Sequence, residues 1–274
     1  MNPDRPSDLP DSAPLPCLRV QDLAYAPPLS PRPLISGLSF ALVPGTIVLV
    51  AGESGSGKTT LLRLLNRLQA PTDGNLWLND RPAAAWDLPS WRRQVGAVFA
   101  QPQLLGLTVG QTLAYGLKLQ GHSPSTLKDR LGEVLDLLQL SPAILDSTAP
   151  LLSRHQQQEV AIARALALHP PFLLLDDPLA SGSAPWFGDL LQRLGPWITS
   201  QRLGLLLTLP QLPPLEIIET AFPPNFRHHT SPSPLQLLEL HQGQGQWLPP
   251  NPSPWADLGQ RLQNRAHQQE AEWD

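Results

Sequence analysis

The glycine-rich stretch GESGSGKT, at residues 52–59, combines residue types that together bind phosphate groups. Glycines allow successive backbone N–H groups to turn inward around an anion, and a lysine after the last glycine can reach the outer phosphates of a nucleotide. The hydroxyl of the following threonine can bind Mg²⁺, and the N-terminus of a helix that begins here adds partial positive charge. In a chain of 274 residues, a chance match to this pattern is on the order of one in a hundred. The stretch therefore predicts a site for a nucleoside triphosphate and Mg²⁺.

The candidate nucleotide-binding residues include the whole loop and the first residues of the helix that follows it. They are Gly52, Glu53, Ser54, Gly55, Ser56, Gly57, Lys58, Thr59 and Thr60. A carboxylate is expected opposite Thr59, because Asp176 ends the apolar run FLLLDD and could hold Mg²⁺ through water. A lone aspartate at the end of a strand is more often a helix cap, so this assignment depends on the rest of the chain.

Strands that alternate with helices are needed to position these groups. The predicted strands cover residues 18–23, 38–42, 47–51, 172–177 and 204–209. A helix with one apolar face is predicted over 59–70, and helical periodicity precedes the last two strands. The fold class is therefore α/β, with a parallel sheet covered on both faces and an antiparallel or mixed sheet formed by the first strands.

Helical patterns dominate between Pro102 and Ser153, most clearly over 109–120 and 127–138. We expect a helical subdomain over 102–155, inserted into the sheet domain. Residues 237–247 predict a two-stranded hairpin with a glycine turn. From 251 to 274 we expect a polar tail or docking peptide, because its one helix, over 255–272, has too little apolar surface to fold alone.

Composition excludes several classes of protein. The net charge is −4 and charged residues make up 15% of the chain, so no basic excess exists to bind nucleic acid. One cysteine, Cys17, excludes a disulfide framework and fits a reducing cytoplasm. Residues 1–16 lack the features of a signal peptide and are expected to be disordered. No apolar run approaches the ~20 residues that span a bilayer, so we expect a cytoplasmic chain that reaches the membrane through a partner.

Three further stretches give the chain a resemblance to a known family. VFAQPQLLGLTV at 98–109, LLSRHQQQEVAIARALA at 151–167 and FLLLDDPLASGS at 172–183 follow the glycine-rich loop in the order and spacing of an ABC transporter ATP-binding subunit. The resemblance covers roughly residues 18–248, and the cassette is expected over 17–250. It implies a P-loop NTPase core, ATP and Mg²⁺ as cofactors, a homodimer or a heterodimer with another cassette, and a separate membrane permease as partner.

The resemblance also implies roles for particular residues. Gln101 matches a glutamine that contacts Mg²⁺ and the attacking water, with a loop amide that caps a turn as the alternative. Asp176 matches the family's magnesium-binding aspartate, and Asp177 follows it at the place of the catalytic base. Tyr25 is the candidate for the aromatic ring that stacks on adenine, although it lies early in its strand and could be a core tyrosine.

The family's signature sequence LSGGQ has a modified counterpart here. Ser153, Arg154, His155 and Gln156 occupy its last four positions, and the resemblance implies that they contact the γ-phosphate held by the other subunit. Ser153 and Gln156 also satisfy a capping box, so an ordinary capped helix is the alternative. His155 places a ring where the family has glycine, and a positive φ there would cost about 1 kcal/mol or more.

Other positions depart from the family pattern as well. Asp177 replaces a glutamate, which withdraws the base by about one methylene and predicts slower hydrolysis. Leu209 follows Thr208 where the family has a histidine, and residues 180–183 lack the usual aspartate. The pair His228 and His229 has no carboxylate or cysteine companions, so no metal site is predicted there.

Two functions therefore remain open. The first is an ATPase subunit that powers a separate permease. The second is a degenerate cassette that binds ATP, hydrolyses it slowly or not at all, and pairs with an intact cassette. An ATPase of this type outside transport, in repair or translation, is a third alternative.

Overall fold

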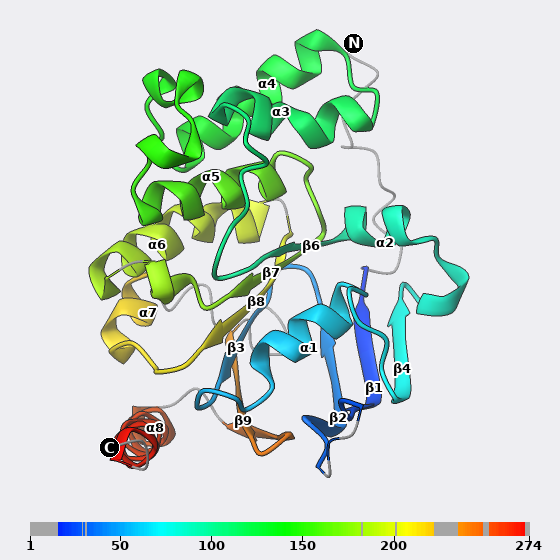
Figure 1. Cartoon of the computed structure of the whole chain (residues 1–274), viewed down its shortest axis with the longest axis vertical. Coiled ribbons are helices and arrows are strands. Elements are labelled where there is room, and N and C mark those ends of the chain that lie inside the picture. Colours follow the sequence, from blue (N-terminus) through cyan, green and yellow to red (C-terminus); the bar gives the residue numbers. More distant parts are fainter. Residues whose placement is uncertain are drawn as a thin grey trace.

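The computed structural model describes residues 16–28, 30, 32–181, 183–200, 202–221, 235–248 and 252–271. Two sheets with helices between and around them make up this part of the chain (Figure 1). The larger sheet has the strand order β10-β9-β3-β8-β7-β6, and the smaller one has the order β2-β1-β4-β5.

The larger sheet is parallel except at one edge. Its parallel strands are β3 (Ile47–Ala51), β6 (Val95–Val98), β7 (Phe172–Asp176), β8 (Gly204–Leu209) and β9 (Leu235–His241), and β10 (Gln244–Leu248) pairs antiparallel with β9. Every residue of β3, β7 and β8 is buried, because helices or the second sheet cover both faces. Their carboxyl ends meet at one edge, which positions the glycine-rich loop beside the end of β7.

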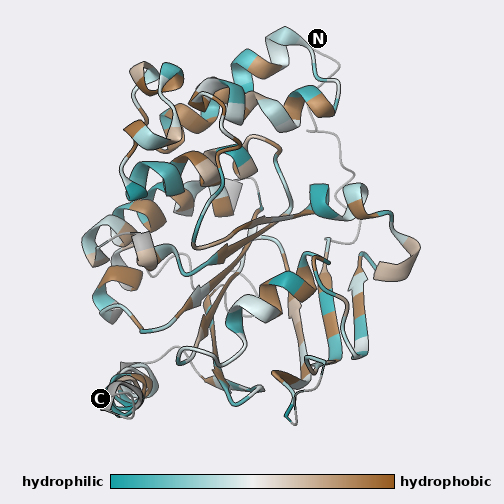
Figure 2. Cartoon of the chain, viewed as in Figure 1, coloured by the Kyte–Doolittle hydropathy of each residue, from teal (hydrophilic) through white to brown (hydrophobic). Residues whose placement is uncertain are grey.

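The smaller sheet is antiparallel and one-sided. Its strands are β1 (Leu18–Tyr25), β2 (Ile35–Leu42), β4 (Asp73–Leu78) and β5 (Arg81–Pro82). Buried and exposed residues mix along β1 and β2, as expected when only one face meets the core. Figure 2 shows the contrast between the hydrophobic strands of the parallel sheet and the mixed strands of this one.

Helix α1 (Lys58–Leu65) packs between the two sheets. One hydrophobic cluster joins Leu61 and Leu62 of α1 to Val48 and Leu206 of the larger sheet and to the inner side of the smaller one. A second cluster covers the opposite face of the larger sheet with α3 (Val109–Leu119), α5 (Arg154–Leu166) and α6 (Ala184–Ser200). The other helices are α2 (Leu88–Gln94), α4 (Pro124–Leu137), α7 (Leu215–Ala221) and α8 (Pro252–Ala271), with 3-10 turns at Ala83–Ala85, Pro142–Asp146, Ala149–Leu151 and Pro178–Ser181.

The structure confirms the predicted α/β fold class, with a mixed sheet, an antiparallel N-terminal sheet and helices inserted between β6 and β7. The boundaries proposed for the cassette and for its helical subdomain stay predictions. Strands β4 and β6 were not predicted, because short runs interrupted by glycine carry a weak pattern. The N-terminal segment lies outside the described residues up to residue 15.

The helix predicted over 59–70 was wrong at its end. It stops at Leu65 because Arg67 adopts a left-handed conformation, with φ 56°. The N–H of Leu68 then donates to the Arg63 carbonyl at 2.8 Å, and the N–H of Arg67 donates to the Leu64 carbonyl at 3.0 Å. These two hydrogen bonds close the last turn. The left-handed residue at such a helix end is usually glycine.

The C-terminal helix α8 does not project from the molecule as a free tail. Trp255, Leu258 and Leu262, spaced along one stripe, are 4%, 0% and 1% exposed and belong to the main hydrophobic cluster. The indole N–H of Trp255 donates to the Pro213 carbonyl at 3.0 Å. Among the described helices, none combines the length and apolar character that crossing a membrane requires.

Replacing Trp255 with alanine should release α8 from the core. The change removes a buried ring and its hydrogen bond, at a cost of about 3–5 kcal/mol. Hydrogen exchange of the α8 amides should then become at least about 100-fold faster. Asp257→Ala, an exposed change on the same helix, should leave exchange as in the wild type. Equally fast exchange in the wild type would mean that α8 is not docked in solution.

Candidate nucleotide-binding site

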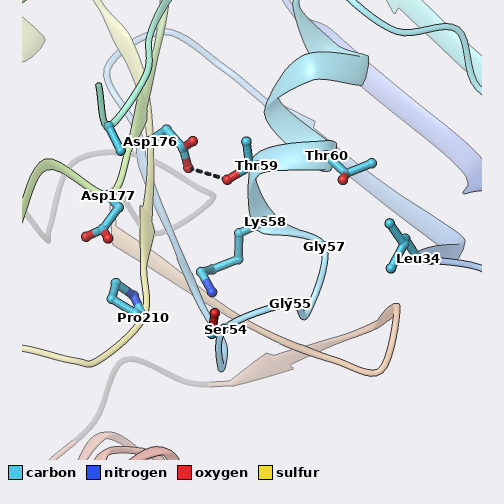
Figure 3. Close-up of a pocket in the computed structure, with 11 residues that line it drawn as sticks. Leu34, Ser54, Gly55, Gly57, Lys58, Thr59, Thr60, Asp176, Asp177 and Pro210 are labelled. Atoms are coloured by element: carbon cyan, nitrogen blue, oxygen red, sulfur yellow. Dashed lines mark hydrogen bonds between the residues drawn. The ribbon is translucent and has the colours of Figure 1, made fainter. Parts of the chain in front are cut away.

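The glycine-rich loop joins β3 to α1 at the carboxyl edge of the larger sheet (Figure 3). Gly55 and Gly57 have φ values of 78° and 103°, a region that favours glycine. A Cβ on Gly57 would clash with the backbone carbonyl of Leu34, and one on Gly52 would clash with that of Leu240. The loop therefore depends on glycine both for its turns and for its close approach to neighbouring backbone.

A cavity of about 350 Å³ opens in front of the loop, a size within the range of small-ligand sites. The loop and the start of α1 form much of its wall. The remaining lining residues are Leu34, Ala100, Asp176, Asp177 and Pro210. The cavity thus combines backbone amides at a helix N-terminus with one lysine and two carboxylates.

Lys58 lies in the wall of this cavity and is only 8% exposed. Its ammonium group donates to the carbonyls of Gly52 at 2.6 Å and Glu53 at 2.7 Å. Burial lowers the pKa of Lys58, and nearby carboxylates, Asp177 most strongly, oppose that shift. An anion in the cavity would meet a lysine that is held by two neutral carbonyl groups and is able to turn toward it.

Thr208 connects the two carboxylate-bearing residues. Parallel pairing of β7 with β8 aligns Asp176 with Thr208, whose hydroxyl donates to Asp176 Oδ1 at 2.7 Å and accepts from the Asp177 N–H at 3.0 Å. The Thr59 hydroxyl donates to the same Asp176 oxygen at 3.2 Å. The sequence reasoning gave Thr208 no role of its own. A hydroxyl residue near the end of the neighbouring parallel strand was the available signal.

Asp177 has an unusual environment. Its φ is 39°, a conformation that costs a non-glycine residue about 1 kcal/mol or more. Its Oδ1 atom is buried and has no hydrogen-bond partner among the described residues. Burial raises the pKa of this carboxyl group, the charge of Asp176 adds to the rise, and Lys58 opposes it. Asp177 therefore lines the cavity with a carboxyl group that burial disfavours in its charged form.

The donors at this site fit Mg²⁺ together with a phosphate. Mg²⁺ prefers oxygen ligands and is usually held by one or two protein groups plus substrate phosphates and water. The Thr59 hydroxyl and the Asp176 carboxylate are such groups. Within the described residues, no cluster of three or more His, Cys, Asp or Glu side chains could hold a metal without help from a ligand.

Gln101 and Tyr25 do not line the cavity, and neither do three residues of the loop itself, Gly52, Glu53 and Ser56. Gln101 is exposed and follows Ala100, which does line it. Tyr25 is half-buried at the end of β1 and packs against the core between the sheets, which favours the core role over base stacking. Leu34, whose N–H donates to the Tyr25 carbonyl at 2.8 Å, lines the cavity instead.

The modified signature forms a regular helix start. Ser153 is the N-cap of α5, and it exchanges two hydrogen bonds with Gln156 in a capping box. Arg154 and His155 are helical and lack a positive φ, so the strain expected at His155 is absent. The His155 ring stacks on Trp186 at a centroid distance of 5.5 Å. All four signature residues are exposed.

The remaining residues that depart from the family pattern are either buried, exposed or outside the described part of the chain. Leu209 is fully buried at the end of β8. Ala180 is exposed, whereas Gly182 lies outside the described residues, as do His228 and His229.

Comparisons with known proteins give the site its context. The family described as ABC transporter matches residues 35–180. The sulfate/thiosulfate import ATP-binding protein CysA of Synechococcus elongatus is 41% identical over 147 residues, which cover 53% of this chain and 42% of that protein. The cell division ATP-binding protein FtsE of Bacillus subtilis is 36% identical over 148 residues, covering 53% and 64%. The chain spans about half the length of the curated relatives it matches.

Solved structures share the fold. One is the ATP-binding cassette MJ0796, solved as a dimer in a post-hydrolysis state bound to ADP and Pi. It aligns with a TM-score of 0.70 at 21% identity, over 85% of this chain and 99% of the MJ0796 chain. The cbiO1 protein of Clostridium perfringens, part of the transporter complex cbiONQ, has a TM-score of 0.72 at 19% identity and covers 92% and 98%. With a family match over more than half of its residues, this chain belongs to the ABC transporter family of ATP-binding cassettes.

Proposed function

We propose that this chain is an ATP-binding subunit that dimerises around MgATP and, by hydrolysing it, drives transport through a separate membrane permease. The observation that carries the proposal is the convergence of Lys58, Thr59, Asp176 and Asp177 on one cavity beside a helix N-terminus. These are the groups needed to bind phosphates, to hold a metal ion and to accept a proton from water.

Phosphate binding uses the loop and Lys58. The amides of residues 54–59 face the phosphates, and the Lys58 ammonium group exchanges its bonds to the Gly52 and Glu53 carbonyls for bonds to phosphate oxygens. Thr59 and Asp176 hold Mg²⁺, which neutralises charge on the phosphates when bound. Thr208 keeps the Asp176 carboxylate oriented toward Thr59.

Asp177 is the proposed base in hydrolysis. Its carboxylate lines the cavity and accepts a proton from water there, and a pKa raised by burial brings the group nearer to the working pH of a general base. Its short side chain places the carboxylate further from the γ-phosphate than a glutamate would, so turnover is slow. Gln101, next to a cavity-lining residue, is proposed to contact Mg²⁺ and the water once nucleotide is bound.

The signature residues act across a dimer in this proposal. Ser153, Arg154, His155 and Gln156 are exposed at the start of α5, where a second cassette could approach them. The dimeric state named for the MJ0796 cassette supports this arrangement. The import role named for CysA supports a permease partner, with this chain on the cytoplasmic face of the membrane.

A slow or inactive regulatory cassette, paired with an intact one, is the second candidate. Its support is the stacking of the His155 ring on Trp186. His155 stands at the signature position where, in the family, a glycine lets the backbone approach a phosphate. The buried Leu209 also gives no imidazole near the cavity. Steady-state phosphate release by the purified protein separates the two candidates.

Lys58→Ala should weaken MgATP binding by about 100-fold, because charge-assisted bonds to phosphate contribute roughly 1.5–3 kcal/mol. Equilibrium dialysis with labelled ATP and Mg²⁺ measures the change. Arg63→Ala, an exposed change on the same helix, should leave affinity unaltered. Saturable binding that survives Lys58→Ala would contradict the proposed phosphate site.

Asp177→Asn should lower phosphate release about 10²- to 10⁴-fold, whereas Asp177→Glu should raise it, because the longer side chain restores the reach of the base. Wild-type release should increase as the pH rises through the raised pKa of Asp177 and then level off. Absence of turnover in both the wild type and Asp177→Glu would favour the regulatory cassette.

The free energy of unfolding should also depend on pH through the titration of Asp177. The folded state holds the Asp177 proton more tightly than the unfolded state, so stability is lost as the pH rises above the ordinary value of 3.8 and through the raised pKa. Asp177→Asn should therefore melt at a higher temperature than the wild type at pH 8, and by a smaller margin at pH 4. An equal margin at both values would contradict the raised pKa.

Thr208→Val should disturb the carboxylates without changing the size of the side chain. The loss of two buried hydrogen bonds should cost about 1–3 kcal/mol in a thermal unfolding experiment. Half-maximal ATP binding should also require more Mg²⁺, because Asp176 is no longer held toward Thr59. Thr208→Ser, which keeps the hydroxyl, should behave like the wild type. An unchanged Mg²⁺ requirement in Thr208→Val would remove Thr208 from the site.

A further inference from the structure

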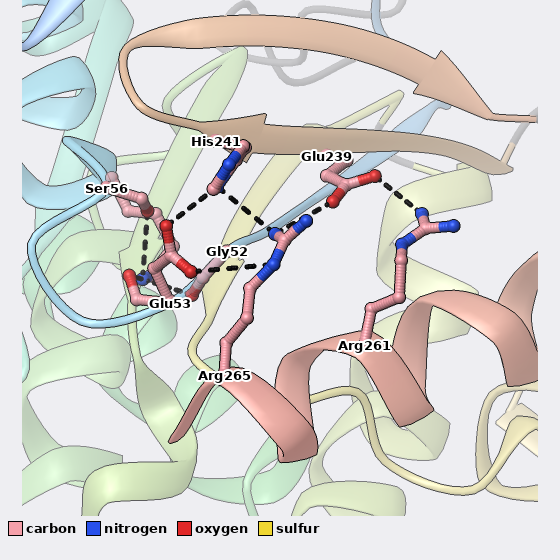
Figure 4. Close-up of polar contacts among 8 residues, drawn as sticks. Gly52, Glu53, Ser56, Glu239, His241, Arg261 and Arg265 are labelled. Atoms are coloured by element: carbon pink, nitrogen blue, oxygen red, sulfur yellow. Dashed lines mark hydrogen bonds and ion pairs between the residues drawn. The ribbon is translucent and has the colours of Figure 1, made fainter. Parts of the chain in front are cut away.

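The C-terminal helix α8 reaches the phosphate-binding loop from the far end of the sequence (Figure 4). The stripe that buries Trp255, Leu258 and Leu262 continues to Arg265, three residues beyond the last of them. Arg265 Nε lies 3.8 Å from Glu53 Oε2, and Glu53 is the second residue of the loop. The helix therefore places a cation against the loop from outside the cavity.

Glu239 and His241, both on β9, complete the contact. Arg265 Nη1 pairs with Glu239 Oε1 at 3.2 Å, and His241 Nδ1 lies 2.7 Å from Glu53 Oε1. Arg265 Nη1 also lies 3.1 Å from His241 Nδ1, but a ring nitrogen that donates its hydrogen to Glu53 cannot accept one from an arginine. We therefore assign Arg265 to the two carboxylates and His241 to Glu53.

These carboxylates need their cations. The side chains of Glu53 and Glu239 are only 13% and 6% exposed, whereas that of Arg265 is 26% exposed. A carboxylate withdrawn from water to this extent is unfavourable when its partner is removed. The Arg265 guanidinium is shared between them, so it is the group whose loss would leave Glu53 with His241 as its only side-chain partner among these residues.

Glu53 is also tied directly to the phosphate-binding lysine. Its backbone carbonyl accepts a hydrogen bond from Lys58 Nζ at 2.7 Å. Its negative charge is one of those that raise the pKa of Lys58. The charge of Glu53 is therefore felt at the place where phosphates bind, and an uncompensated carboxylate there would repel a nucleotide.

We propose that Arg265 is a positioning residue for nucleotide binding: from α8 it neutralises and holds Glu53, so that the loop keeps its phosphate-binding shape and charge. The inference rests on the proposed function, since it requires that the cavity binds MgATP. It makes nucleotide affinity depend on a helix that contributes no residue to the cavity wall.

Arg265→Gln in the full chain should weaken MgATP binding by about tenfold, measured by isothermal titration calorimetry. Arg265→Lys keeps the charge but loses the planar guanidinium, so it should recover part of the affinity. The double variant Glu53→Gln/Arg265→Gln removes both charges and should bind MgATP more tightly than Arg265→Gln alone, because no uncompensated carboxylate remains beside the loop. Such a recovery is not expected if Arg265 only holds the helix in place.

Arg261→Gln is the matched control. Arg261 lies one turn before Arg265 and pairs with the other oxygen of Glu239 at 2.7 Å. Its loss should leave MgATP affinity close to that of the wild type, while hydrogen exchange of α8 shows whether the helix stays docked in each variant.

The outcomes separate the two proposals. A wild-type protein that does not bind MgATP overturns the proposed function. A wild type that binds, with Arg265→Gln binding equally well, overturns the inference and leaves the function intact. Weak binding in Arg265→Gln that the double variant fails to relieve, or an equal loss in Arg261→Gln, also overturns the inference, because the effect then comes from helix docking alone.

Discussion

The parallel pairing of β7 with β8, beside β3, is the constraint on which the rest of the site depends. The register that sets Asp176 against Thr208 brings a hydroxyl, a carboxylate and the glycine-rich loop to one edge of the sheet. A shift of one residue would turn these side chains to the opposite faces. The buried apolar runs resist such a shift, because every residue of the three strands is covered. Core packing thus determines the geometry of the polar groups.

Charge compensation is the second organising feature. Lys58 faces Asp176 and Asp177 inside the cavity, and Arg265 faces Glu53 and Glu239 behind the loop. Inside the cavity one cation faces two carboxylates, whereas behind the loop Arg261 also pairs with Glu239, so two arginines face two glutamates. The two carboxylates in the cavity would favour a polyanion that arrives together with Mg²⁺, for which the oxygen donors of Thr59 and Asp176 are suited.

The sequence predicted the parts of the fold that have strong local signals. The five predicted strands and the C-terminal hairpin correspond to β1, β2, β3, β7, β8 and the β9–β10 pair, because their apolar runs are long or their turns contain glycine. It left the last segment as a tail or docking peptide and did not predict that α8 packs on this chain, since that depends on contacts with distant residues such as Pro213. Thr208 and Arg265 were not predicted as site residues, because their contacts are with residues far away in the sequence, Asp176 and Glu53. Tyr25 and His155 were judged from family positions, and their packing was visible only in the structure.

The contact between Arg265 and Glu53 also constrains how the protein is made. Glu53 is translated more than two hundred residues before Arg265. During that interval the strands beside the loop can pair with one another, but Glu53 lacks its arginine partner. Such a distant contact forms late in folding, because a long segment of chain must be closed to make it. If Arg265 has the proposed role, a nascent chain would reach its full affinity for nucleotide only after α8 has been translated and has docked.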